Sequence, residues 1–300
     1  MELRLLRYFL MVAQTENITK AADSLHITQP TLSRQMSMLE EETGVKLFER
    51  SLGVRKIILT EEGVLLKRRA QEILELVDKT SHELVDAGNE IQGTISIGCG
   101  EIATAKLLPD LIESFRAKHP LVRFDISTTD GKSIQDRIGQ GLLDFGILLV
   151  KPDSIAYDFM QTGVKETWVA LMAPDHPLSD KEFVNAADLT GIPLILPQNT
   201  DHSSPLGRWL GPALSQINCS ITCNLTSNAA LLTRLGCAIT IKDSVELAQD
   251  RFISRPLTPE LCTKSVLIWK KGQVSSKTCM LFRDFARDYF EKRQEKLSGQ

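Results

Sequence analysis

Apolar residues near the start of the chain recur with the spacing of amphipathic helices. In the run from Ile18 to Leu25 they fall at i, i+3, i+4 and i+7, which is one face of a helix, and Asn17 just before it is a good N-cap. Thr28 or Gln29 is predicted to cap a second helix, and Pro30 then falls in the first turn, where its missing N–H costs little. The pattern predicts two short helices joined by a tight turn. The second would bury Leu32, Met36 and Leu39.

The opposite face of the second helix is polar and uncharged to basic. No acidic residue lies between Asp23 and Glu40, so this face does not repel a polyanion. Hydroxyl, amide and guanidinium groups are the ones that read base edges and hold phosphates in double-stranded DNA. The alternative is an ordinary helical hairpin in a core. The candidate DNA-contacting residues on this helix are Gln29, Pro30, Thr31, Ser33, Arg34 and Ser37.

The neighbouring segments complete a winged helix-turn-helix. A preceding helix is predicted from Leu3 to about Gln14, with its apolar residues on one face. Gly44 is a helix stop signal, and the residues 47–48 and 57–59 after it are predicted to form two short strands. The loop between these strands is basic, so it is expected to reach the DNA backbone or the minor groove. Its candidate contact residues are Arg50 and Arg55.

These residues carry a resemblance to a known family. The stretch "AADSLHITQPTLSRQMSMLEEETGVKLFER", followed by "LTEEG", resembles the N-terminal domain of LysR-type transcriptional regulators, and the match runs from Leu6 to Gly63. The length and α/β character of the remainder fit the same family. The resemblance implies a cytoplasmic, homo-oligomeric repressor or activator, a dimer or tetramer, that binds double-stranded DNA and a small effector. RNA polymerase is a further candidate partner.

Composition and motifs argue against a membrane-spanning protein and against an enzyme. A length of 300 residues suggests two or more domains, and no apolar run approaches the roughly 20 residues of a membrane span. The formal net charge is -3, so DNA binding is inferred from local arrangement and not from overall charge. No Gly-x-Ser-x-Gly, phosphate-binding glycine loop or His-Glu-x-x-His occurs, so no enzyme activity is expected.

The six cysteines show no Cys-x-x-Cys spacing and no accompanying histidine cluster, so neither a metal nor another cofactor is expected. Reduced thiols in the cytoplasm are the simplest interpretation. A redox-sensing pair of Cys219 and Cys223 is the alternative. Both lie in one predicted strand, where positions four apart are too distant along the extended backbone to form a disulfide.

Residues 61–90 are predicted to form a linker helix. Between residues 63 and 88, apolar positions alternate in steps of four and three, which is the a/d seam of a coiled coil. The seam favours dimerisation with a second chain, and the alternative is a long helix packed on its own domain. Gly88 and Gly93 then mark a hinge. The seam residues are Leu66, Ala70, Ile73, Val77, Thr80, Leu84 and Ala87.

From residue 91 onward, predicted strands alternate with helices, which implies a mainly parallel sheet with helices on both faces. By resemblance to this family and to periplasmic binding proteins, residues 91–300 form an effector domain. Its subdomain I comprises about 91–160 and 266–300, and its subdomain II about 161–265. The expected class is therefore α/β, with an all-α winged helix-turn-helix (residues 1–60) at the N-terminus. The strands are predicted at "TISIG", "RFDIST", "FGILLV", "TWVALMAP", "PLILP", "CSITCNLT", "CAITI", "RFISRPL" and "KSVLIWKKG".

The effector is expected between the two subdomains, because open α/β sheets bind ligands at the carboxyl ends of their strands. Glu101 is a carboxylate in a loop that holds Ser or Thr in many relatives, which favours a cationic or polyhydroxylated effector. For each loop the alternative is an ordinary strand-to-helix turn. The candidate effector-binding residues are Cys99, Gly100, Glu101, Thr128, Thr129, Asp130, Gln198, Asn199, Thr200, Thr226 and Ser227.

Overall fold

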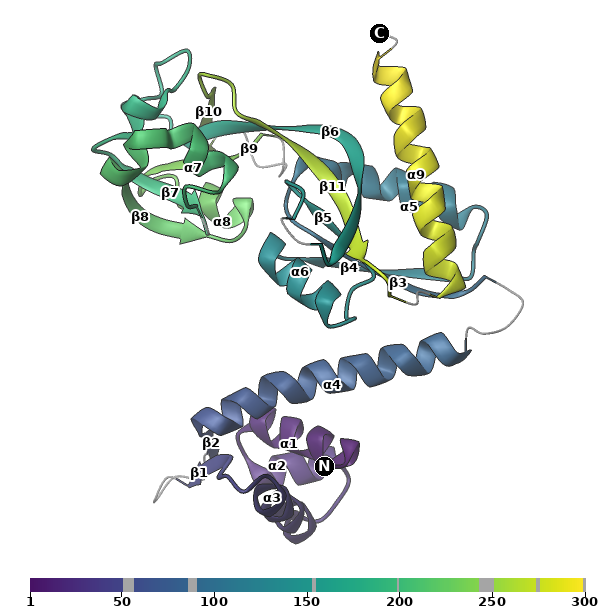
Figure 1. Cartoon of the computed structure of the whole chain (residues 1–300). Helices are drawn as coiled ribbons and strands as arrows, with labels where there is room; N and C mark the ends of the chain where they lie inside the picture. Colours follow the sequence, from purple (N-terminus) through teal and green to yellow (C-terminus); the bar gives the residue numbers. More distant parts are fainter. Residues whose placement is uncertain are drawn as a thin grey trace. The chain divides into compact units, whose positions relative to one another are not determined.

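A computed structural model describes residues 1–50, 57–85, 91–152, 155–198, 200–242, 251–273 and 276–298, apart from the side chains of residues 50, 82–85, 103 and 296–298 (Figure 1). The chain divides into two compact units, Met1–Ala87 and Gly88–Gln300, and each is described by itself. None of the helices in the described ranges is long and apolar enough to cross a membrane.

The first unit is a helical bundle with a small two-stranded wing. Asn17 caps α2 by accepting hydrogen bonds from the amides of Thr19 and Lys20, and Thr28 caps α3 by accepting one from the amide of Thr31. Of the two predicted caps for the second helix, the structure therefore has Thr28. The elements are α1 (Leu3–Thr15), α2 (Ile18–Ser24), α3 (Gln29–Thr43), β1 (Phe48–Arg50), its antiparallel partner β2 (Ile57–Leu59) and α4 (Glu61–Val85).

Glu40 fastens the wing to α3. Its carboxylate accepts hydrogen bonds from the amides of Leu47 (2.8 Å) and Phe48 (3.3 Å) and from the ammonium group of Lys46 (2.7 Å). Burial alone would raise the pKa of Glu40, but these hydrogen bonds hold it below its ordinary value. The first of the three glutamates on α3 therefore has a structural task, and it orients the start of β1.

One part of the predicted coiled-coil seam on α4 is used within the chain. Ala70 is fully buried in the core of the first unit, and Leu66 and Ile73 pack against the same core. For this half of the helix the alternative interpretation, packing on its own domain, is the correct one. Among the α4 side chains that the structure describes, the exposed apolar ones lie on other faces: Val64, Leu65 and Leu76. The side chain of Leu84 and residue Ala87, both part of the predicted seam, lie outside the described part of the chain.

In the described part of the second unit, nine strands form one sheet in the order β4-β3-β5-β11-β6-β9-β7-β8, with β10 paired to β6 (Figure 1). Pairing is parallel among β3, β4 and β5 and among β7, β8 and β9, so each end of the sheet has the predicted parallel character. The strands are β3 (Gly93–Cys99), β4 (Val122–Thr128), β5 (Phe145–Leu148), β6 (Tyr157–Met172), β7 (Pro193–Pro197), β8 (Asn218–Cys223), β9 (Cys237–Ile241), β10 (Ile253–Pro256) and β11 (Cys262–Lys270).

Two long strands, β6 and β11, join the two ends of the sheet, and they pair antiparallel with each other. We call β3–β5 with their helices lobe I, β7–β9 with their helices lobe II, and β6 and β11 the crossing strands. The predicted mainly parallel sheet is therefore wrong for the centre, because the chain passes between the lobes without a crossover helix. The sequence pattern also missed the first ten residues of β6, where polar side chains interrupt the apolar alternation.

Helices cover both faces of lobe I. The helices α5 (Leu108–Arg116) and α9 (Lys277–Ser298) lie side by side on one face, and α6 (Gly131–Gly139) covers the other (Figure 1). Phe115 and Phe282 meet edge to face in the core between α5 and α9, with ring centroids 5.2 Å apart. Lobe II carries two short helices that the sequence pattern did not predict, α7 (Pro205–Leu210) and α8 (Thr226–Leu231).

Candidate functional site

The N-terminal half of α3 presents a polar surface to solvent. The side chains of Gln29, Pro30, Thr31, Arg34 and Ser37 are exposed, and that of Ser33 is half-buried. The apolar residues Leu32, Met36 and Leu39 are buried on the opposite face, as the helical periodicity predicts. The Arg50 side chain and Arg55, the two predicted wing contacts, lie outside the described residues.

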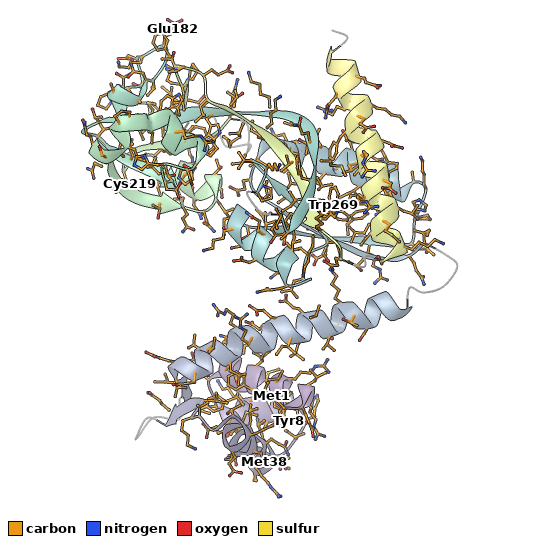
Figure 2. The ribbon with its side chains drawn as sticks, in the orientation of Figure 1. Met1, Tyr8, Met38, Glu182, Cys219 and Trp269 are labelled. Atoms are coloured by element: carbon orange, nitrogen blue, oxygen red, sulfur yellow. The ribbon has the colours of Figure 1, made fainter. Side chains whose placement is uncertain are left out.

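The groups on this surface remain available to a ligand. Among the described residues, the guanidinium of Arg34 forms no ion pair. The hydroxyls of Thr28 and Thr31 are hydrogen-bonded to each other (2.8 Å) at the start of the helix, and both side chains remain exposed. Met38, four residues after Arg34, is 45% exposed, and Figure 2 labels it on α3. Its i+4 spacing from Arg34 could have added it to the predicted surface.

The second unit contains a cavity of about 570 Å³, a volume typical of small-molecule sites. Its lining comes from the loops after β3, β4 and β5 in lobe I and from the loops of β7, β8 and β9 in lobe II, with Trp168 from β6. The structure therefore brings the predicted loops together around one space. The predicted residues on its lining are Gly100, Glu101, Thr129, Asp130, Gln198 and Thr226.

Four predicted residues lie off the lining, and each has a local reason. Cys99 points into the core of lobe I, where burial and the charge of Glu166 raise the pKa of its thiol to about 12. Thr128 ends β4 with an exposed side chain, and the hydroxyl of Thr200 donates a hydrogen bond to the carbonyl of Pro197 (2.7 Å). Ser227 is turned toward Glu101. Asn199 lies outside the described residues.

The carboxylates on the lining are occupied by nearby donors. Asp130 caps α6 and accepts from the amides of Lys132 and Ser133 and from the hydroxyl of Ser133. Burial opposes its charge, but these bonds hold the pKa of Asp130 below its ordinary value. Asp201 accepts from the hydroxyl of Ser203 and from two amides, which likewise lowers its pKa.

Glu101 reaches from lobe I to lobe II. One carboxylate oxygen accepts a hydrogen bond from the backbone amide of Ser227 (2.7 Å), and the other accepts one from the Ser227 hydroxyl (2.8 Å). The carboxylate is therefore satisfied by the protein itself. This removes the reason for expecting Glu101 to select a cationic effector.

Cationic side chains on the lining keep donors to spare, and the sequence pattern did not single them out. Lys132 follows the α6 cap, Lys151 follows β5 with its ammonium 4.7 Å from the ring centroid of Phe159, and Arg208 donates to the carbonyl of Ser203. Lys132 and Lys151 come soon after the ends of β4 and β5, which is a weak signal because lysine is common in loops, whereas Arg208 lies within α7 and gave no such signal.

Much of the remaining wall is apolar, with side chains such as Ile134, Leu148 and Ile239, and polar side chains such as Gln135, Asn224 and Thr240 lie among them. Trp168 contributes its ring while its indole N–H donates to the hydroxyl of Thr263 (3.3 Å). A cavity lined by both apolar and polar groups suits a small molecule that carries both characters.

No group of three His, Cys, Asp or Glu side chains within the described ranges is arranged to hold a metal ion. All six cysteines are free thiols. Cys219 and Cys223 lie in β8, as predicted, and Cys219 is exposed on lobe II (Figure 2) while Cys223 is buried against the cavity.

The sequence matches two family descriptions. Residues 3–64 match "Bacterial regulatory helix-turn-helix protein, lysR family", and residues 88–291 match "LysR substrate binding domain". The chain is 28% identical over 308 residues to the Hca operon transcriptional activator HcaR of Escherichia coli, which covers 100% of this chain and 99% of HcaR. It is 29% identical over 189 residues to the transcriptional regulator YtlI of Bacillus subtilis, which covers 63% of this chain and 60% of YtlI.

The fold is similar to that of CbnR, described as a LysR family transcriptional regulator. The CbnR crystal structure matches with a TM-score of 0.73 at 20% identity. Full-length CbnR complexed with its target DNA matches with a TM-score of 0.71 at 22% identity. In each case the match covers 96% of this chain and 99% of CbnR.

Proposed function

Since this chain belongs to the LysR family of transcriptional regulators, we propose that it controls transcription by coupling a small molecule in the cavity of its second unit to specific DNA binding by α3. The observation that carries the proposal is that one chain contains two surfaces whose polar groups are available to bind a partner. The first is the exposed polar face of α3, and the second is a two-lobed cavity whose lining keeps free donors.

At the DNA, α3 enters the major groove with its N-terminal half. Arg34 reads a guanine, since a guanidinium can donate two hydrogen bonds to the O6 and N7 atoms of that base. Gln29, Thr31, Ser33 and Ser37 contact further base edges or phosphates from the same face, with Pro30 packing beside them. Arg50 and Arg55 of the wing hold the backbone or the minor groove.

The ligand is a small anion with an apolar body. The lining carboxylates Asp130, Asp201 and Glu101 are satisfied by amides and hydroxyls, whereas Lys132, Lys151 and Arg208 keep N–H groups that an anion can accept. Trp168 and the aliphatic wall suit the apolar part. Thr129 and Gln198 supply neutral polar contacts. The protein acts in the cytoplasm without catalysing a reaction.

Self-association is part of the proposal. Dimeric helix-turn-helix regulators bind two DNA half-sites about one helical turn apart, which requires two copies of α3. The exposed apolar residues Leu65 and Leu76 on α4 suit a contact with a second copy of this chain. The proposal extends to a tetramer of two such dimers and to a contact with RNA polymerase, both of which the resemblance to the family suggests.

The test is a mobility-shift assay with the full chain and the DNA upstream of its own gene. A specific complex is expected, and a small carboxylate found by thermal-shift screening should change its affinity or its footprint. The variants Thr129→Ala and Gln198→Ala should weaken this response. Thr128→Ala is the matched control, because Thr128 is the next residue to Thr129 but lies off the lining.

A competing assignment is a ligand-binding module without a role in transcription. No specific complex with any upstream DNA, together with tight binding of the carboxylate, would favour it. Wild-type responses in both lining variants would instead place the effector elsewhere.

A further inference from the structure

Glu101 and Ser227 belong to opposite lobes, and the crossing strands are the covalent connection between those lobes. Glu101 follows β3 in lobe I, and Ser227 is the second residue of α8 in lobe II. Both hydrogen bonds between them, of 2.7 and 2.8 Å, have charged acceptors and are therefore of the stronger kind. A separation of the loops by little more than an ångström breaks both, because a donor and an acceptor about 3.6 Å apart no longer form a hydrogen bond.

The backbone amide of Ser227 has no hydrogen-bond acceptor within its own helix, α8. The first amides of any helix lack an intrahelical acceptor, and in α8 the amide of Ser227 is satisfied by Glu101 from across the cavity. The contact therefore forms only in the arrangement of the lobes seen here.

We propose that Glu101 is an internal clasp that holds the two lobes in the arrangement described here, which we call closed. This inference concerns the regulation of the cavity and rests on the proposed function only in taking that cavity as the ligand site. A ligand that fits the closed lobes keeps the clasp, whereas one that needs more room must break it. The clasp thereby sets the starting conformation from which a ligand shifts the protein.

Cys223 gives a direct measure of closure. Its side chain packs beside Ile195 and Ala229 in lobe II and also lines the cavity, so we expect its thiol to react faster when lobe I moves away from that wall. Cys219 lies in the same strand but is exposed, so its alkylation rate is a control for the reactivity of the reagent itself. Cys237 is fully buried and does not line the cavity, so a rise in its alkylation rate indicates unfolding of the second unit.

The experiment measures the rate of alkylation of each thiol by N-ethylmaleimide in the full chain, without ligand or DNA, by peptide mass spectrometry. Glu101→Ala should raise the rate at Cys223 by roughly tenfold or more, the size expected when charge-assisted hydrogen bonds bias an equilibrium. Cys219 and Cys237 should keep their wild-type rates. Hydrogen exchange at the Ser227 amide should accelerate in parallel.

Two further variants and a control isolate the clasp. Glu101→Gln keeps the shape but turns an amide group toward a Ser227 donor, and Ser227→Ala removes the hydroxyl alone, so both should give intermediate rates at Cys223. Glu113→Gln removes an exposed carboxylate of α5 in the same lobe and should change nothing.

An unchanged rate at Cys223 in Glu101→Ala overturns the proposal, since the lobes would then stay closed without the contact. Rates that rise together at Cys223 and Cys237 in all three variants also overturn it, because the contact would then support the fold and not the closure. Neither result bears on DNA binding or on the response to a ligand. Failure of the proposed function would appear instead in the mobility-shift assay.

Discussion

Arg34 and Asp130 illustrate two opposite uses of a charged side chain in this protein. The Arg34 guanidinium projects from α3 without an ion pair in the described part of the chain. The Asp130 carboxylate has its oxygens filled by donors from the first turn of α6. The first is available for recognition, while the second is committed to local structure. Substitutions at the two positions should therefore affect different properties.

Arg34→Ala should weaken binding to the specific DNA site by about 1–3 kcal/mol, the loss expected for one bidentate contact to guanine. Arg34→Lys should keep most of the affinity for unrelated DNA but lose specificity at one base pair, because an ammonium group cannot match two acceptors in one plane. Competition binding at fixed salt measures both effects. If wild type, Arg34→Ala and Arg34→Lys all show the same sequence specificity, Arg34 does not contact a base.

Asp130→Ala should destabilise the second unit by about 1 kcal/mol at neutral pH through loss of the N-cap, and Asp130→Asn should cost less because asparagine also caps. Since the folded-state pKa of Asp130 is lowered, its stabilisation is complete above the unfolded pKa and is lost as the pH falls through the folded value. Urea denaturation from pH 7 downward should show the gap between wild type and Asp130→Ala closing. A gap independent of pH would show that the carboxylate charge contributes nothing.

At the scale of elements, α4 has one face packed in the first unit and another face exposed. One face, with Ala70 and Ile73, completes the core of the first unit, while Leu65 and Leu76 are 53% and 42% exposed on the outer side. A long helix with charged neighbours and exposed leucines is typical of a surface that a second chain covers. The crossing strands also contribute to two parts of the structure, because each of them runs from one lobe to the other.

The double variant Leu65→Asp/Leu76→Asp should dissociate the protein into smaller species in sedimentation while its circular dichroism stays unchanged. Ile73→Asp is the contrasting variant, because it places a charge against the core of the first unit and should unfold that unit. If the double variant keeps the wild-type mass, α4 is not the contact between copies.

At the scale of the whole molecule, each unit has a core of its own. The core of the first unit gathers around Phe9 and Leu39, and the main core of the second gathers around Phe115 and Leu111. Cooperative unfolding follows contiguous cores, so the two units should unfold as separate events. A ligand in the cavity should stabilise the second event alone.

Matched leucine truncations test this independence by calorimetry. Leu39→Ala should lower the unfolding temperature of the first unit only, and Leu111→Ala that of the second only. Each should cost about 2–5 kcal/mol, because both side chains are almost fully buried. A single transition that both variants lower equally would show that the units unfold together.

The sequence by itself determined the helix-turn-helix. Caps, turn residues and apolar spacing within about 60 residues are local signals, so Asn17, Leu32 and the exposed Arg34 could be assigned without any tertiary contact. Most strands of the second unit were also predicted, because buried parallel strands are continuous apolar runs. The family followed from the same local motifs.

Only the tertiary structure decided which polar groups are free. Glu101 looked like a ligand-binding carboxylate in the sequence, and its partner Ser227 lies 126 positions further along the chain, so no local pattern could show that the two oxygens are occupied. The same holds for Ala70 and Ile73, whose heptad spacing suits a second chain and the chain's own core equally well. Spacing fixes the face on which a side chain lies, whereas the packing of distant segments fixes what that face contacts.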